Sequence, residues 1–120
     1  MPVDIFKDCV RPAGDLAGVF EFDEDTGYFY LYDISNSASP RIVDYLHICS
    51  YVPDFADHHI ELRWTSDQEK VGLFIRDALW AVFIPGTQSK YGGDYRPGRI
   101  PSLPVEAKSG FWRGPGPGLA

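Results

Sequence analysis

The densest cluster of groups that could bind a metal or transfer protons is the segment DFADHHIE, from Asp54 to Glu61, with two histidines and three acids. On a strand, His59 and Glu61 would share one face, and His58 would point to the other. A zinc site usually needs a third and a fourth ligand at recognisable spacing, and His47 is the one histidine left to supply them. We therefore interpret the segment as a solvated loop that enters a strand, with no metal ligand and no general acid or base.

A second candidate is DEDTG, from Asp23 to Gly27, where carboxylates at alternate positions precede a glycine. Hard oxygen ligands in this order could bind calcium, but the distal bidentate glutamate of a specific calcium loop is absent. Asp and Gly are also the residues that turns require. The segment is interpreted as an acidic turn.

Motifs for covalent catalysis and for phosphate binding are absent from the sequence. There is no GxSxG, GxxxxGK or GxGxxG pattern, and Cys9 and Cys49 lack the CxxC spacing of redox and zinc sites. Both cysteines are expected to be structural thiols, although a disulfide between them stays open. We predict a protein without a cofactor and without enzymatic activity.

Charge is distributed unevenly along the chain, whose net charge is −6. Residues 1–60 hold 11 acids against three bases, which gives −8, whereas residues 61–120 hold six acids against eight bases, which gives +2. An acidic half repels nucleic acids and anionic membranes and favours encounter with a basic protein. A merely solvated acidic surface is the plainer interpretation.

The strongest structural signal is a pair of aromatic-rich runs, Ala17 to Phe22 and Gly27 to Asp33, separated by the turn-prone DEDT. They predict a β-hairpin. Side chains alternate along a strand, so Tyr28, Tyr30 and Tyr32 should form a row on one face of the second strand. Such a row is either packed or displayed as a stacking platform for a sugar or a peptide.

The run from Arg41 to Tyr51 fits two structures. Ser39 and Pro40 resemble the start of a helix, but the run is rich in β-branched and aromatic residues. A strand is favoured, with a helical turn at its start as an option. Strict alternation would then place Ile42, Leu46 and Ile48 on one face.

Three further strands follow as a meander, at residues 59–65, 70–75 and 79–84. The first alternates apolar and charged residues, and the other two are apolar on both faces, as central strands are. The predicted core is Phe20, Phe29, Leu31, Leu46, Ile60, Leu62, Trp64, Leu73, Trp80, Val82 and Phe83.

Residues 1–84 are predicted to form a single β-rich domain with an N-terminal extension. From Pro85 to Ala120, 14 of 36 residues are Gly or Pro, which rules out a central strand. We expect an irregular wrap or tail of the same domain, anchored by Tyr91, Tyr95, Phe111 and Trp112. The fold class is mainly β, an antiparallel meander or a small sandwich, with α+β as the alternative. No signal peptide or membrane span is recognised, so we expect a soluble cytoplasmic protein.

The order of these motifs resembles a family of small bacterial proteins that carry a domain of unknown function. The matching segments are an acidic turn with TGYFY (Phe20 to Asp33), a D-x-LHI stretch (Asp44 to Ile48), an EIRW-type strand (Glu61 to Thr65) and a closing AVF (Ala81 to Phe83). The resemblance covers about residues 17–84. It implies a fold and a bacterial origin, but no activity.

These features favour a non-enzymatic protein-interaction domain, of which an immunity protein that neutralises a basic toxin or effector is one form. A small-ligand domain using the aromatic face is the alternative, and a metal-dependent or hydrolytic enzyme is the third. Neither nucleic acid nor a membrane is expected as a partner. The residues predicted to bind the partner are Asp23, Glu24, Asp25, Tyr28 and Tyr30.

Overall fold

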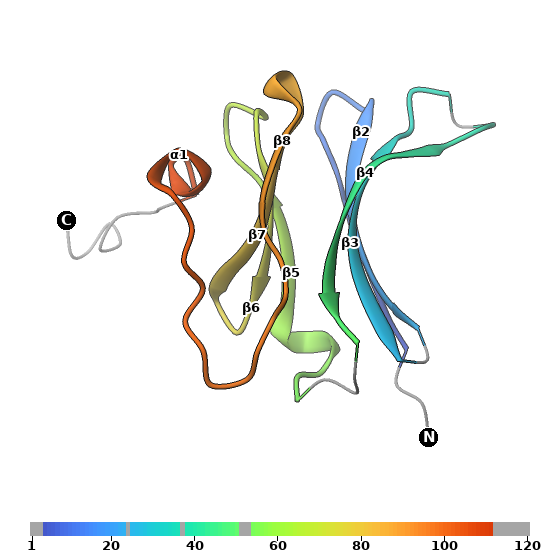
Figure 1. Ribbon diagram of the computed structural model, residues 1–120. Coiled ribbons are helices and arrows are strands. Elements are labelled where there is room, and N and C mark those ends of the chain that lie inside the picture. Colours follow the sequence, from blue (N-terminus) through green and yellow to red (C-terminus); the bar gives the residue numbers. More distant parts are fainter. Residues whose placement is uncertain (1–3, 24, 37, 51–53, 112–120) are drawn as a thin grey trace.

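The computed structural model describes residues 4–23, 25–36, 38–50 and 54–111 (Figure 1). Its strands form two four-stranded antiparallel sheets that face each other. In each sheet, neighbours along the chain are neighbours in space. The first sheet holds β1 (Ile5–Val10), β2 (Leu16–Asp23), β3 (Thr26–Asp33) and β4 (Arg41–Cys49). The second holds β5 (Ile60–Trp64), β6 (Val71–Ile75), β7 (Ala78–Ile84) and β8 (Ser89–Gly92).

Two short 3-10 turns, Asp57–His59 and Pro85–Thr87, and one helical turn, α1 (Val105–Lys108), complete the described elements. The mainly β prediction is confirmed. The meander and the sandwich that the sequence left as alternatives are both present, since two meanders form one sandwich.

The predicted hairpin is β2 and β3, with Phe20 opposite Phe29. The ambiguous run after Pro40 is a strand, β4, paired with β3. Strict alternation fails in it, because Tyr32 pairs with Ile42 while Leu31 pairs with Asp44, which leaves Val43 in a bulge. Ile42 therefore lies on the outer face, 48% exposed, instead of packing with Leu46 and Ile48.

The core lies between the sheets and contains eight of the 11 predicted core residues, with Leu46 and Leu62 partly buried against it. The remaining one, Val82, is buried in a second apolar cluster on the outer face of the second sheet. The sheets approach closely at Gly18, where a Cβ atom would come within 2.7 Å of Val71 Cγ2. The core residues absent from the predicted set are Ile5, Phe22, Ile48, Cys49, Phe55, Val71, Ile75, Ala81 and Tyr95.

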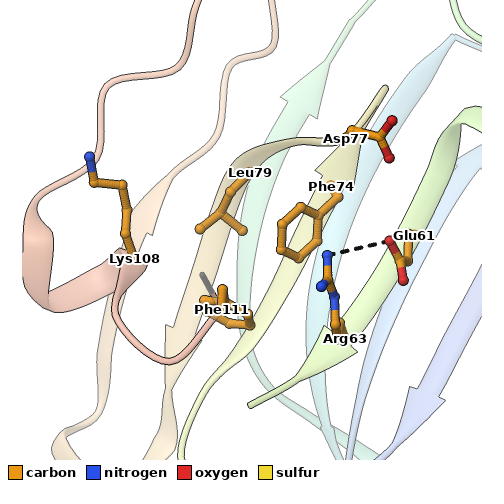
Figure 2. A pocket seen from close by; sticks show the side chains of 7 residues that line it. All are labelled: Glu61, Arg63, Phe74, Asp77, Leu79, Lys108 and Phe111. Carbon is orange, nitrogen blue, oxygen red and sulfur yellow. Dashed lines mark hydrogen bonds and ion pairs between the residues drawn. The ribbon is translucent and has the colours of Figure 1, made fainter. Parts of the chain in front are cut away.

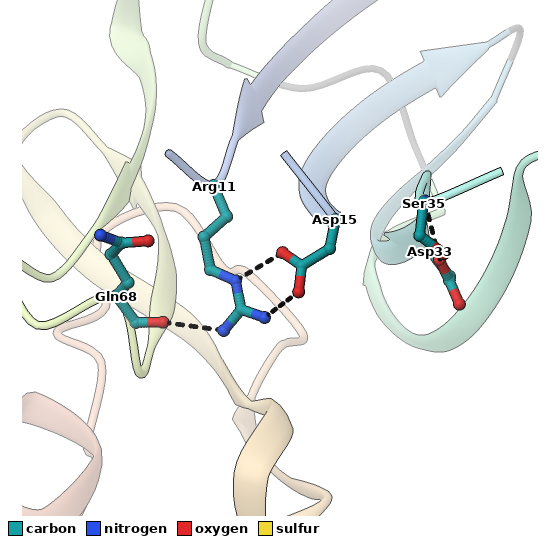
Figure 3. Close-up of polar contacts among 5 residues, drawn as sticks. All are labelled: Arg11, Asp15, Asp33, Ser35 and Gln68. Atoms are coloured by element: carbon teal, nitrogen blue, oxygen red, sulfur yellow. Dashed lines mark hydrogen bonds and ion pairs between the residues drawn. The ribbon is translucent and has the colours of Figure 1, made fainter. Parts of the chain in front are cut away.

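Polar contacts also join the two sheets. The Trp64 indole N–H donates to the Cys9 carbonyl oxygen at 2.9 Å. Arg11, after β1, donates to both carboxylate oxygens of Asp15 at 2.8 and 2.5 Å and to the Gln68 carbonyl oxygen at 3.1 Å (Figure 3). The same figure shows Asp33 accepting from the Ser35 amide and hydroxyl, which shapes the turn after β3.

After β8 the chain returns to the first sheet. The Asp94 and Tyr95 amides donate to the carbonyl oxygens of His47 and Ile48, and the Tyr95 ring lies against Phe55 and Trp80. Tyr95 is 5% exposed. The anchors expected at Tyr95 and Phe111 are therefore buried, whereas Trp112 and the residues after it lie outside the described part of the chain.

Residues 103–111 cover the outer face of the second sheet, where α1 lies in Figure 1. Ala107 and Phe111 are buried in a second apolar cluster with Phe74 and Val82. The Lys70 ammonium holds this cover by donating to the carbonyl oxygens of Glu106 and Ser109 and to the Ser109 hydroxyl.

No disulfide joins Cys9 to Cys49. Burial raises the pKa of the Cys9 thiol. Within the described segments, no helix is long and apolar enough to cross a membrane.

Replacing Trp64 by Ala should lower the free energy of unfolding by about 3–5 kcal/mol, because a buried ring and its contact between the sheets are lost. Chemical denaturation measures this change. Phe6→Ala removes an aromatic ring that is 61% exposed and should change stability by about 0.5 kcal/mol or less. Equal effects of the two substitutions would contradict the burial of Trp64.

Stability should fall on acidification below about pH 4. Hydrogen bonds from Arg11 hold the pKa of Asp15 below its ordinary value, and the Tyr95 hydroxyl does the same for Asp54. A carboxyl with a lowered folded-state pKa stabilises the fold above its unfolded pKa, and this stability is lost as pH falls through the folded pKa. Urea denaturation between pH 7 and 2 measures the free energy of unfolding. Its decrease on acidification should be smaller in the double variant Asp15→Asn with Asp54→Asn than in wild type. Parallel curves for wild type and variant would contradict this assignment.

Candidate functional site

The two sheets differ in what covers their outer faces. Residues 103–111 cover the second sheet. Of the described residues outside the strands of the first sheet, Ile34 and Pro40 of the β3–β4 loop border its outer face. Register places alternate residues of β1, β3 and β4 on the outer face of the first sheet. We call this surface the aromatic face, and its members are Phe6, Val10, Tyr28, Tyr30, Tyr32, Ile42 and Tyr45.

The tyrosines of the aromatic face contact one another. The rings of Tyr28 and Tyr30 stack with centroids 5.7 Å apart, and Tyr45 meets Tyr28 edge-on at 6.0 Å. Tyr32 continues the row at 5.9 Å from Tyr30. Tyr45 is 56% exposed, so the cluster has an open aromatic surface as well as a packed one. Aromatic side chains on a rigid strand lose little entropy when a partner binds them.

A groove of about 300 Å³ runs along the aromatic face over β2. Its floor is formed by the small side chains Ala17 and Val19, and its walls include Phe6, Val10 and Tyr32. Asp8 also lines it. Such a groove can accommodate the alkyl stem of a long side chain whose charged end meets a carboxylate.

Acids border the aromatic face. Alternation places Asp8, Glu21 and Asp23 on it, and Asp25 follows in the exposed turn. Asp23 is exposed, and a hydrogen bond from the Thr26 hydroxyl reaches Asp25 at 3.0 Å. We call these four residues the acidic rim. A small hollow joins Glu21 and Asp23 to Phe6, so the rim is continuous with the aromatic face.

Most other acids of the first half have a basic partner. Asp15, Asp33, Asp44, Asp54 and Asp57 form ion pairs with Arg11, Arg41, Lys90, Arg76 and Lys7, respectively. Among the described residues, the acidic rim has no ion pair within 4.0 Å. The negative charge that the sequence predicted is therefore concentrated, unpaired, beside the tyrosines.

Burial, and then the negative charge of Glu21, raise the pKa of Tyr30. The Tyr30 hydroxyl therefore remains a hydrogen-bond donor at neutral pH. One cation does reach the aromatic face: the Lys90 ammonium lies 5.2 Å from the Tyr45 ring, with its charge paired to Asp44 at 2.9 Å.

Four of the five residues predicted to bind a partner lie on this surface: Tyr28 and Tyr30 on the face, and Asp23 and Asp25 on the rim. Glu24 lies outside the described residues. Sequence reasoning missed Tyr45, Ile42, Phe6 and Val10. A firm strand assignment for residues 41–49, with its register against β3, would have found the first two.

The histidine-rich segment after Asp54 is a 3-10 turn that leads into β5. Asp57 pairs with Lys7 at 2.9 Å, and His59 Nδ1 accepts a hydrogen bond from the Ala56 amide. Burial is the main cause that lowers the pKa of His59, and the neighbouring His58 adds to it. Over the described segments, no three His, Cys, Asp or Glu side chains converge as metal ligands.

At one edge of the aromatic face, three residues form a hydrogen-bonded relay that no motif predicted. His47 Nε2 lies 2.5 Å from the Ser50 hydroxyl oxygen, and His47 Nδ1 lies 2.9 Å from Asp94 Oδ1. The same order of groups activates a serine nucleophile in hydrolases, where backbone amides also stabilise the oxyanion. Here the amides of Gly93, Asp94 and Tyr95 already donate to carbonyl oxygens. The relay orients the His47 ring, which meets Tyr28 edge-on at 5.6 Å.

Comparison with known protein families gives a match that covers most of the chain. The model of the family described as "Uncharacterized protein conserved in bacteria (DUF2251)" covers residues 3–95. It includes the segments on which the sequence resemblance depends and extends across both sheets to Tyr95. No curated protein and no solved structure matches the chain.

Proposed function

The chain belongs to the bacterial family DUF2251, and for this member we propose a non-enzymatic function: its aromatic face binds a basic partner protein. The form of this function that we favour is that of an immunity protein, which neutralises a cognate toxin or effector in the cytoplasm by covering it. The observation that carries the proposal is an uncovered aromatic face whose bordering charges are acids without basic partners.

Exposed apolar side chains are the first support. Phe6, Val10, Ile42 and Tyr45 are each 47–61% exposed, and they lie on β1 and β4, the two edge strands of the first sheet. The tyrosines of β3 lie between these edges on the same face. Scattered exposed apolar residues are ordinary, but a set joined on one face is typical of an interaction surface. In the second sheet, residues 103–111 bury the corresponding apolar face. A segment of this chain therefore covers one apolar outer face, and we infer that a partner covers the other.

Chemical complementarity supports a basic partner. An arginine or lysine side chain can stack on the tyrosine rings while its charge meets Asp8 or Glu21. The groove over Ala17 and Val19 can accommodate the alkyl part of that arginine or lysine side chain. The acidic rim attracts positive charge over about 8 Å at physiological ionic strength, which accelerates encounter.

The alternative from the sequence, a domain that binds a sugar or a peptide, would use the same tyrosines. Stacking of a neutral sugar requires no acidic rim and depends little on salt. A salt-dependent association rate is therefore the observation that separates the two functions. The hydrolytic alternative would depend on Ser50 and His47, and we expect no ester hydrolysis that Ser50→Ala abolishes.

Substitution of exposed aromatic residues tests the face. A partner is first identified by pull-down from the host bacterium, and affinity is then measured by surface plasmon resonance. Phe6→Ser with Tyr45→Ser should weaken binding at least about tenfold, mainly through faster dissociation, because large aromatic side chains contribute most of the binding energy at interfaces. Ile100→Ser, at a residue that is 91% exposed and far from the face in sequence, serves as the control. Unchanged affinity in the double variant would refute the aromatic face as the binding site.

Charge removal at the β2–β3 turn tests two members of the acidic rim, Asp23 and Asp25, together with Glu24 between them in the sequence. Asp23→Asn, Glu24→Gln and Asp25→Asn together should slow association more than they speed dissociation, and the difference should shrink as salt rises. The matched control, Glu69→Gln, Asp77→Asn and Glu106→Gln, removes the same net charge from the second sheet and its cover. If both variants associate at the same rate, electrostatic steering by the rim is wrong. If no protein binds in a face-dependent manner, ligand binding becomes the favoured function.

A further inference from the structure

A pocket of about 370 Å³ opens on the outer face of the second sheet, opposite the aromatic face (Figure 2). Strands β5, β6 and β7 and the C-terminal cover all contribute to it. Its lining residues are Glu61, Arg63, Phe74, Asp77, Leu79, Lys108 and Phe111.

The apolar part of this pocket is formed by Phe74, Leu79 and Phe111. The rings of Phe74 and Phe111 meet at 75° with centroids 5.6 Å apart. Phe111 reaches the sheet because residue 72 is glycine, where a Cβ atom would come within 3.0 Å of the Phe111 ring and 2.7 Å of Leu79. Lys70 fixes the cover through three oxygens of residues 106 and 109. The pocket is therefore part of the fold.

Arg63 supplies the polar part. Its guanidinium carbon lies 4.1 Å from the centroid of the Phe74 ring, and one terminal nitrogen lies 3.4 Å from Glu61 Oε1. Its Nε is buried and has no hydrogen-bond partner among the described residues. The Arg63 side chain is 24% exposed, so the part of it that an acceptor from outside the chain can reach is not Nε but the rest of the guanidinium.

The charges around the pocket determine which kind of anion can bind there. Arg63 and Lys108 contribute two positive charges, and Glu61 and Asp77 contribute two negative ones. A singly charged carboxylate can pair with the guanidinium, which binds planar carboxylates through two nitrogens. A phosphate dianion gains the same contact but meets stronger repulsion from the two acids.

We propose that this pocket binds a small aromatic carboxylate. The carboxylate accepts hydrogen bonds from the accessible nitrogens of the Arg63 guanidinium, and the ring packs among Phe74, Leu79 and Phe111. This site goes beyond the proposed protein interaction, because it lies on the other sheet and uses none of the residues of the aromatic face. The two functions can therefore be tested separately.

Phenylacetate is the probe, and two-dimensional NMR titration of the full chain is the measurement. Phenylacetate should bind saturably with a Kd on the order of 1 mM and shift the signals of Arg63, Phe74 and Phe111. Phenylacetamide has the same shape without the charge and should bind at least about tenfold more weakly. Inorganic phosphate should not compete. Equal binding of phenylacetamide, or competition by phosphate, would overturn the proposal.

Substitution separates this site from unspecific binding. Arg63→Lys keeps the positive charge but removes the planar guanidinium, and it should weaken phenylacetate binding at least about tenfold. Arg99→Lys, at an exposed arginine outside the pocket, should leave it unchanged. Leu79→Ala, which removes apolar contact without altering charge, should weaken binding several-fold. Thermal denaturation confirms that each variant is folded. Wild-type affinity in Arg63→Lys would refute the site.

Discussion

The alternation of side chains along a strand is the constraint on which the rest of this structure depends. A strand with apolar residues at successive positions must place half of them away from the sandwich core. This is the case for Tyr28 to Tyr32 in β3 and for all of β6. The fold therefore has two apolar outer faces in addition to its core. One is covered by residues 103–111, and the other is the aromatic face.

The same alternation determines which acidic side chains have basic partners. Acids on the inner side or at the ends of strands meet bases from the other sheet or from a turn, as Asp44 meets Lys90 and Asp57 meets Lys7. Acids on the outer face of the first sheet have no opposing sheet to supply a base. Of the 11 acids in residues 1–60, five form ion pairs and four are the unpaired carboxylates of the acidic rim that border the tyrosines.

Local patterns in the sequence predicted the β2–β3 hairpin, the β5–β7 meander and most of the core, because each depends on neighbours along the chain. The tyrosine row was also predicted, since alternation alone determines it. Ile42 lies on the same face as that row because a bulge at Val43 interrupts the alternation of β4, and no local signal marks the bulge. The contact of His47 with Asp94 and the cover of Phe111 over Gly72 depend on residues about 40 or more positions apart, which periodicity cannot relate.

The order of strands in each sheet also has a kinetic consequence. Because both sheets are uninterrupted meanders, most pairing is between neighbours along the chain, and the contact order of each sheet is low. During synthesis the first sheet is complete at residue 49, before any strand of the second has been made. Its inner face, with Phe20, Phe29 and Leu31, remains exposed to solvent until the second sheet has been synthesised. Docking of the two sheets, and not formation of either one, is the step at which this chain is most exposed to misassembly.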